Sequence, residues 1–153
     1  MSVSESQSVI ASLYLPVSNK QLLLPNVSVA EVVAYQEPKK RNDAPEYFLG
    51  TVHWRGIDIP VISYEIANDL KQNETSAAAR IAVINTIGKH HDALPFFAII
   101  TQGIPRLVKV SDDIIKKTKQ KPGVADSALI KVDGEDATIP NLGYLESLVY
   151  SHI

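Results

Sequence analysis

The sequence lacks several residues and motifs on which enzyme sites are commonly built. It contains no cysteine, which excludes disulfide bridges, thiolate nucleophiles and thiolate metal ligands. It has only four histidines, and no two stand at the His-x-x-x-His spacing that places two imidazole rings on one helix face. Its seven glycines form neither a G-x-x-x-x-G-K-[ST] phosphate loop nor a G-x-S-x-G nucleophile elbow. We therefore expect a protein that is not an enzyme and that binds no metal or other cofactor.

The sequence also lacks a charge excess of one sign and a long hydrophobic run. Fifteen Lys and Arg residues oppose seventeen Asp and Glu residues, so the net charge of −2 does not attract nucleic acid or an anionic membrane. The longest strongly apolar stretch, 94–100, is broken by Pro95 and falls far short of the roughly 18 residues that span a bilayer. Residues 1–8 have neither the basic nor the apolar region of a secretion signal, and we predict a disordered tail there. These features favour a cytoplasmic protein without direct membrane insertion.

What the 153 residues do contain is a series of short strand signals. Runs rich in Val, Ile, Leu and Tyr, each closed by Pro, Gly, Asn or Asp, are typical of short strands joined by tight turns. The predicted strands are 9–15, 21–24, 32–35, 49–54, 57–62, 81–87, 96–101, 107–109, 128–132 and 137–139. No long helices alternate with them, so the pattern predicts a mostly β, mostly antiparallel and barrel-like fold.

Helical signals are few. The clearest is at the C-terminus, where Asn141 can cap a helix whose apolar positions share one face at three- and four-residue spacing. Ser111 is predicted to cap a short turn that runs through Lys117. Ser28 and Glu31 fit a capping box for one further turn between two strands.

The one strongly basic run, from Lys116 to Lys121, suggests an alternative function. A barrel-type nucleic-acid-binding protein places such charges next to aromatic rings on which bases stack. No aromatic residue lies within the run. We therefore interpret the run as a solvated surface and expect no nucleic-acid partner, while a nucleic-acid-binding barrel remains the alternative.

The segment 50–62, with the sequence GTVHWRGIDIPVI, is the most informative part of the chain. Two short apolar runs flank Arg55 and Gly56, which predicts a hairpin. Pro60 is placed at a strand start, where its missing N–H is tolerated. On hairpin signals alone, Arg55 is an ordinary exposed residue of a turn.

The same segment resembles the signature of CheW-like domains, the adaptors of bacterial chemosensory arrays. In that signature a hydrophobic strand is followed by N-L-R-G and then by P-V. The stretches LLLP at 22–25 and VAEVV at 29–33 fit the preceding motifs of the family, and the resemblance covers about residues 9–150. His53 and Trp54 replace the usual Asn-Leu, and Ser63 replaces the usual acid after P-V. These differences make the chain most similar to the divergent ChpC branch of type IV pilus chemosensory systems.

The resemblance implies a fold and a function. The fold is two interlocked five-stranded SH3-like barrels with short helices, in which residues 9–150 form a single domain. Subdomain 1 covers about 16–79, and subdomain 2 covers about 80–150 plus the N-terminal strand, which crosses into it. The function is that of a non-catalytic adaptor, associated with membrane chemosensory arrays, that couples the cytoplasmic tip of a chemoreceptor to the regulatory domain of a CheA-type histidine kinase.

The resemblance also implies a set of partner-binding residues: Glu31, Trp54, Arg55, Gly56 and Pro60. Glu31 and Arg55 stand where the signature has its Glu and Arg, and an Arg at a turn needs an acceptor when it is partly desolvated. We therefore expect their charged groups to lie within about 4 Å of each other. Trp54 is either an exposed aromatic anchor for the partner or a core residue, because large aromatic side chains serve both roles.

Overall fold

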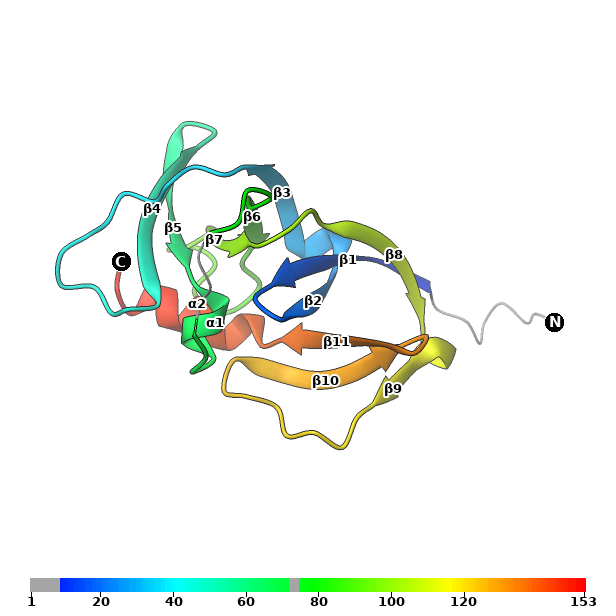
Figure 1. The fold of residues 1–153 in the computed structure, drawn as a ribbon. Coiled ribbons are helices and arrows are strands. Elements are labelled where there is room, and N and C mark those ends of the chain that lie inside the picture. Colours follow the sequence, from blue (N-terminus) through cyan, green and yellow to red (C-terminus); the bar gives the residue numbers. More distant parts are fainter. Residues whose placement is uncertain (1–8, 72–74) are drawn as a thin grey trace.

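The structure, a computed structural model, describes residues 9–71 and 75–153; the predicted tail at 1–8 lies outside them. These residues form two sheets, as Figure 1 shows. The first contains, in order, β8 (Arg106–Ser111), β1 (Val9–Val17), β2 (Lys20–Pro25), β11 (Glu135–Pro140), β10 (Asp126–Val132) and β9 (Ile115–Lys117). The second contains β3 (Val29–Ala34), β6 (Arg80–Asn85), β7 (Phe96–Thr101), β5 (Ile57–Ile62) and β4 (Phe48–Trp54). The predicted mostly β fold is therefore confirmed.

The first sheet has six strands instead of the predicted five. The turn predicted from Ser111 through Lys117 ends early, because the 3₁₀ turn η3 covers only Asp112–Ile114. The Ser111 side chain does not cap this turn and instead donates a hydrogen bond to the Asp113 carboxylate. The chain then pairs as β9 with β10, a conformation that suits the β-branched Ile115.

Each sheet is closed by a bend in the chain. In the six-stranded sheet, η3 alone separates β8 from β9, which are the two outer strands. In the five-stranded sheet, the segment after β3 reaches β4, where Lys39 and Thr51 exchange two backbone hydrogen bonds of 2.8 and 3.1 Å. Gly50 permits this approach, because a Cβ atom there would lie 2.2 Å from the Lys39 carbonyl oxygen.

Strands from both halves of the sequence contribute to both sheets. The N-terminal strand does cross over, since β1 pairs with β8. However, β2 stays beside β1 in the six-stranded sheet, while β6 and β7 join the five-stranded sheet. Hydrophobic patterns indicate where strands lie but not which strands pair, so they do not predict this arrangement.

The largest core lies between the sheets and includes the C-terminal helix α2 (Leu142–Tyr150). Leu15 and Leu22 come from the six-stranded sheet, Phe97 comes from the five-stranded sheet, and Leu145 comes from α2. The predicted cap is confirmed, because the Asn141 side chain accepts a 3.0 Å hydrogen bond from the Tyr144 N–H. Two smaller cores fill the interiors of the separate sheets.

Two further short helical turns differ from the predictions. The capping box of Ser28 and Glu31 is wrong, because the turn η2 (Asn26–Ser28) ends at Ser28 and Glu31 lies in β3. The turn forms earlier because Pro25, with its fixed φ, occupies the N-cap position. An unpredicted helix, α1 (Tyr64–Ala67), follows β5 and is capped by Ser63, whose hydroxyl accepts a 3.1 Å hydrogen bond from the Ile66 N–H.

Candidate functional site

The predicted hairpin is formed by β4 and β5, joined by Arg55 and Gly56 alone. Arg55 has a φ of 48° and Gly56 a φ of 81°. Positive φ at both positions is the pattern of a type I′ turn, whose twist matches that of antiparallel strands. Gly56 adopts this conformation without strain, whereas Arg55 is one of the few residues with a side chain to do so.

Three side chains meet at the base of this turn. An Arg55 Nη2 atom lies 3.0 Å from Glu31 Oε1, and the Trp54 indole N–H donates a 2.9 Å hydrogen bond to the same oxygen. The Arg55 guanidinium also lies 5.0 Å from the centroid of the Trp54 ring. The predicted approach of Glu31 and Arg55 is confirmed. We call these three residues the hairpin trio; it joins β3 and β4, the two outer strands of the five-stranded sheet.

Burial differs sharply within the hairpin trio. The Arg55 side chain is 68% exposed and the Glu31 side chain 39% exposed, whereas Trp54 is only 8% exposed. Trp54 packs in the core of the five-stranded sheet, edge-on to Phe96 at 4.9 Å between ring centroids. Trp54 is therefore a core residue that fixes Glu31, and it does not expose a ring to a partner.

Pro60 is also buried, and it is not at a strand start as predicted. It is the fourth residue of β5 and stands opposite Thr51 of β4. Its missing N–H is tolerated because the parallel pairing of β5 with β7 begins only at Val61. Pro60 thus shapes the strand behind the turn.

The hairpin carries a second polar pair, which sequence reasoning did not single out. His53 Nδ1 and Asp58 Oδ1 lie 3.0 Å apart, and both side chains are exposed. The two residues stand directly opposite each other across the strands. Their spacing around a two-residue turn predicts this register and could have revealed the pair.

Comparison with known proteins identifies the family. The sequence model of the CheW-like domain matches residues 12–148. The chain belongs to the CheW-like domain family. The structure is similar to that of the scaffolding protein TtCheW from Thermoanaerobacter tengcongensis, with a TM-score of 0.73 and 18% identity over 87% of this chain and 89% of that chain. No curated protein matches the sequence.

The histidines of this CheW-like domain do not gather around one point. His90 stacks on Tyr150 at 3.9 Å between ring centroids, whereas Nδ1 of the adjacent His91 lies 2.9 Å from the Thr86 hydroxyl. Within residues 9–71 and 75–153 there is no group of three or more His, Asp or Glu residues suited to hold a metal ion. Over the same residues, none of the helices has the length and apolar character needed to cross a membrane.

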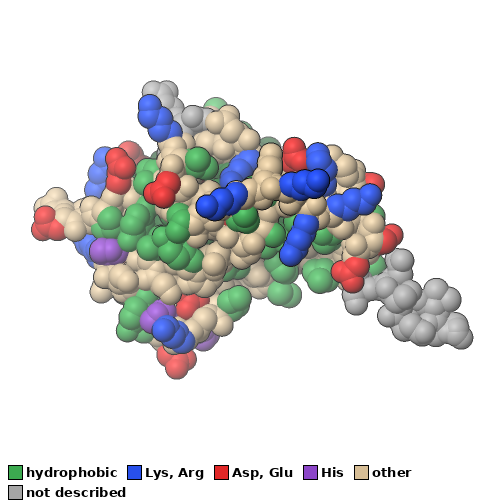
Figure 2. Space-filling model, turned by 90° about the horizontal axis from the view of Figure 1, so that it is seen from below, with side chains coloured by type: hydrophobic (Ala, Val, Ile, Leu, Met, Phe, Trp, Pro, Cys, Tyr) green, Lys and Arg blue, Asp and Glu red, His purple; other side chains and the backbone are tan. Residues whose placement is uncertain are grey.

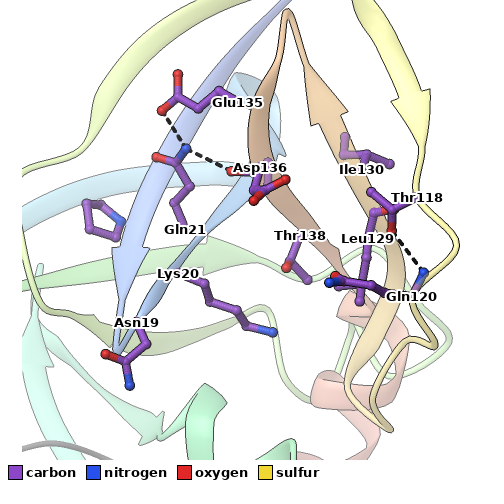
Figure 3. A pocket seen from close by; sticks show the side chains of 12 residues that line it. Asn19, Lys20, Gln21, Thr118, Gln120, Leu129, Ile130, Glu135, Asp136 and Thr138 are labelled. Atoms are coloured by element: carbon purple, nitrogen blue, oxygen red, sulfur yellow. Dashed lines mark hydrogen bonds between the residues drawn. The ribbon is translucent and has the colours of Figure 1, made fainter.

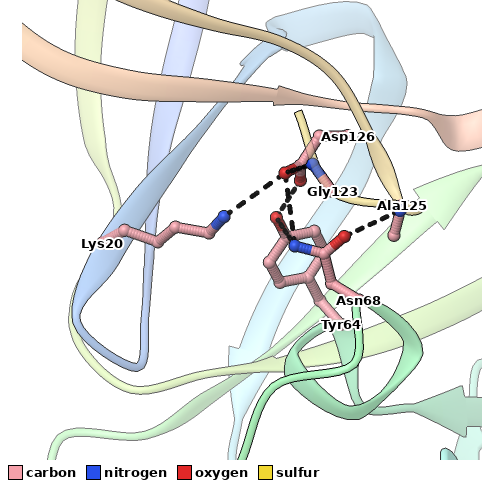
Figure 4. A network of polar contacts seen from close by, with 6 residues as sticks. All are labelled: Lys20, Tyr64, Asn68, Gly123, Ala125 and Asp126. Carbon is pink, nitrogen blue, oxygen red and sulfur yellow. Dashed lines mark hydrogen bonds and ion pairs between the residues drawn. The ribbon is translucent and has the colours of Figure 1, made fainter. Parts of the chain in front are cut away.

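A second polar cluster of the CheW-like domain is buried where α1 meets the six-stranded sheet (Figure 4). The Asp126 carboxylate accepts hydrogen bonds from the Tyr64 hydroxyl, from the Asn68 amide at 3.2 Å and from the Gly123 N–H at 2.8 Å. Lys20 Nζ lies 3.7 Å from the same carboxylate. Burial and the hydrogen bond to Asp126 raise the pKa of the Tyr64 hydroxyl. We call this group, Lys20, Tyr64, Asn68 and Asp126, the buried cluster.

Glu65 makes a further buried contact from the same helix. Its Oε2 atom accepts hydrogen bonds from the Ser18 N–H at 2.9 Å and the Ser18 hydroxyl at 2.8 Å. Ser18 lies in the turn between β1 and β2. Helix α1 therefore holds two separate parts of the six-stranded sheet. These contacts join residues 47 to 62 positions apart, so no local pattern predicts them.

Proposed function

We propose that this chain is a non-catalytic adaptor of a bacterial chemosensory system. In this role it couples the cytoplasmic tip of a chemoreceptor to the regulatory domain of a CheA-type histidine kinase, in the cytoplasm beside membrane arrays. Membership of the CheW-like family supports the proposal, as does the similarity of the fold to TtCheW, which is a scaffolding protein. The observation that carries it is the hairpin trio, which holds an exposed ion pair in a fixed position on the surface.

The hairpin trio is suited to recognition because its charges are held before a partner arrives. The type I′ turn restricts the backbone of Arg55, and the Trp54 ring and Glu31 carboxylate restrict its side chain. Less conformational entropy is then lost on binding than for a free arginine. The guanidinium has five N–H donors, and the exposed part of Arg55 can offer some of them to a carboxylate or carbonyl of the kinase.

The other predicted residues shape the hairpin that carries the ion pair. Gly56 completes the turn, Pro60 shapes β5, and Trp54 positions Glu31 from within the core. Ile57, which is 43% exposed, provides an apolar contact next to the turn. A partner surface with one apolar residue and a fixed ion pair fits a transient interface, in which a few central groups carry most of the affinity.

We further propose that the chain belongs to the ChpC-like branch and acts in a type IV pilus system that controls twitching motility. The residues that differ from the family signature support this assignment. His53 and Trp54 place the contact with Asp58 and the indole N–H in the hairpin. Ser63 caps α1 in place of the usual acid. A kinase that pairs with this hairpin should therefore differ at the corresponding contact from kinases that recognise an Asn-Leu sequence.

The proposed function is tested by titrating the purified chain with the regulatory domain of a chemosensory kinase from the same genome. Arg55→Ala should weaken binding about tenfold or more, as for a central interface residue. Lys40→Ala, which removes an exposed cation from the same half of the molecule, is the matched control and should leave the affinity unchanged. Equal affinities of the two variants would contradict the role of the hairpin trio.

A stability measurement must accompany this titration. Exposed ion pairs contribute only about 0–1 kcal/mol to folding, so Arg55→Ala should have nearly the melting temperature of the wild type. A large drop in melting temperature together with lost binding would indicate that the pair of Arg55 and Glu31 is structural. Failure of the wild-type chain to bind any such kinase or receptor would contradict the adaptor function itself.

A further inference from the structure

The six-stranded sheet carries a groove of about 570 Å³, on the other sheet from the hairpin trio (Figure 3). It exists because β2 and β11 run parallel but pair only at Leu22 and Thr138. Toward the start of both strands, the gap is bridged by the Gln21 side chain, whose Nε2 donates to Asp136 O at 3.0 Å and to Glu135 Oε2 at 2.7 Å. A side chain thus occupies the place of a strand-to-strand hydrogen bond, and the groove lies beside it.

The lining of the groove combines an apolar floor with side-chain amides. Leu129 and Ala137 supply the apolar part. Asn19 and Gln120 line it from either side, as Figure 3 shows, and within the described residues their side chains make no hydrogen bond. A side-chain amide offers both donors and an acceptor, which is what an extended peptide backbone requires. Lys20 also lines the groove, but its ammonium group is already paired with Asp126 of the buried cluster.

The two acidic residues of the groove are already neutralised. Glu135 lies 2.5 Å from an Arg106 Nη2 atom, and the hydrogen bond from Gln21 is the main cause that lowers the pKa of the Glu135 carboxyl. Asp136 forms an ion pair with Lys131 at 2.9 Å. Neither carboxylate is therefore an unpaired negative charge that would repel an acidic ligand.

A row of lysines lies beside the groove, on the segment that supplies Thr118 and Gln120 to its lining. The strand register places Lys116 directly opposite Lys131, and like charges at such positions repel each other. Exposed lysines continue along the same segment: Lys117, Lys119 and Lys121. Within residues 9–71 and 75–153, Lys116 and these three form no ion pair. Figure 2, which views the molecule from below, shows Lys and Arg side chains spread over this face.

Two further carboxylates lie farther along, on the side of Lys116 and Lys131 away from most of the groove. Asp113 and Asp133 line a smaller pocket of about 310 Å³ together with these two lysines. Asp113 accepts a hydrogen bond from the Ser111 hydroxyl. The positive charge that lies away from these acids is therefore that of Lys117, Lys119 and Lys121, on the segment that supplies Thr118 and Gln120 to the groove.

We propose that this groove, with its lysine edge, binds an extended acidic peptide segment of a partner protein. The positive edge attracts the charge, the side-chain amides receive the backbone, and Leu129 accepts an aliphatic side chain. A peptide fits better than a nucleic acid because the described residues that line the groove include no aromatic ring for base stacking. The basic run, interpreted from sequence as a solvated surface, thereby gains a binding role that is separate from the hairpin trio.

The probe for a test is a fluorescein-labelled peptide with the sequence Glu-Leu-Glu-Glu-Leu-Glu-Glu-Leu, titrated with the full chain by fluorescence anisotropy. Binding should be detectable at low salt and weaken as salt is raised, because exposed charges are screened. Lys116→Glu should reduce the affinity about tenfold, since it reverses a charge beside the groove, two residues before Thr118 of its lining. Lys109→Glu makes the same charge change on β8, no residue of which lines the groove, and should reduce the affinity less than about twofold.

Backbone amide shifts measured by NMR locate the peptide independently. The largest changes should fall on Thr118, Gln120, Leu129 and Thr138, with none at the β4–β5 turn. Absence of binding, equal losses in Lys116→Glu and Lys109→Glu, or shifts centred elsewhere would overturn the proposal. Tighter binding of a 12-nucleotide single-stranded DNA to the same residues would overturn it in favour of a nucleic-acid partner. Lys116→Glu should bind the kinase normally, which separates this test from that of the adaptor function.

Discussion

Two carboxylates in this molecule have the same kinds of neighbour but opposite burial. Glu31 accepts a hydrogen bond from Trp54 and pairs with Arg55, while Asp126 accepts one from Tyr64 and pairs with Lys20. In both groups the cation lies 5.0 Å from the centroid of the aromatic ring. The Glu31 side chain is 39% exposed and that of Asp126 only 2% exposed.

The difference shows that burial decides whether the same kinds of group serve recognition or stabilise the fold. At the surface, water competes for the charges, so the hairpin trio contributes little to folding and stays available to a partner. In the interior, water does not replace a lost partner, so the loss of one member leaves the others without a hydrogen bond or counter-ion. The buried cluster therefore fixes α1 against the six-stranded sheet, whereas the hairpin trio presents a surface.

The sharpest test of this comparison is Asp126→Ala. It removes the acceptor for Tyr64, Asn68 and Gly123 and leaves the partly buried Lys20 without its counter-ion. We expect a loss of about 3–5 kcal/mol in the free energy of unfolding, measured by urea denaturation. Asp92→Ala, at an exposed position, is the control and should change it by less than about 0.5 kcal/mol. If Asp126→Ala loses no more stability than Asp92→Ala, the buried cluster is not a structural contact.

Trp54→Phe tests how the aromatic residue contributes to the exposed group. The substitution keeps a ring in the core but removes the indole N–H that holds Glu31. We expect a loss of about 1–2 kcal/mol in stability from the missing hydrogen bond and the smaller ring. Kinase affinity should fall as well, because Glu31 is less restrained. If affinity is unchanged while stability falls, the indole N–H does not position the ion pair.

The stability of the wild-type protein at high pH tests the buried cluster through the titration of the Tyr64 hydroxyl. Because the folded state raises the pKa of Tyr64, the unfolded chain releases this proton at lower pH, near the ordinary pKa of about 10. The contribution of Tyr64 is fully present below about pH 10 and falls above it, by up to about 1.4 kcal/mol per pH unit. Urea denaturation between about pH 9 and about pH 11 should show a shallower fall for Tyr64→Phe than for the wild type. Parallel pH curves would contradict the raised pKa.

The smallest effect is expected for charges that belong to neither group. Lys117→Gln combined with Lys119→Gln removes two exposed cations far from the hairpin in the sequence. Kinase affinity should stay within about twofold of the wild type, because exposed charges outside an interface contribute little. A loss of kinase affinity comparable to that of Arg55→Ala would indicate that the kinase binds the six-stranded sheet and not the hairpin trio.

Local features of the fold can be predicted from the sequence, and long-range ones cannot. The hairpin is predicted at 49–54 and 57–62 and is found at Phe48–Trp54 and Ile57–Ile62, because alternation and the Arg-Gly turn are local signals. Helix α1 has only four residues and depends on contacts with Ser18 and Asp126, which no periodicity reveals. The buried cluster escapes prediction for the same reason.

The site shows the same division. The contact of Glu31 with Arg55 joins distant parts of the sequence and is predicted only because a family signature contains both residues. Whether Trp54 is exposed depends on how β3 and β4 close the sheet, so the sequence leaves both of its roles open. Residue types indicate which chemistry is present, and only the tertiary structure assigns one carboxylate to the surface and the other to the interior.

Gly50 lies within β4 and Gly56 in the turn that follows it, and the two positions differ in what they permit. At Gly56, with a φ of 81°, no atom lies within 4 Å of the place a Cβ would occupy. At Gly50 that Cβ would collide with the Lys39 backbone. A saturation library should therefore recover Asn and Asp beside Gly at position 56 but glycine alone at position 50, because left-handed backbone tolerates a short polar side chain whereas a backbone collision tolerates none. Mutational tolerance around this hairpin is thus set by how the barrel closes, independently of any partner.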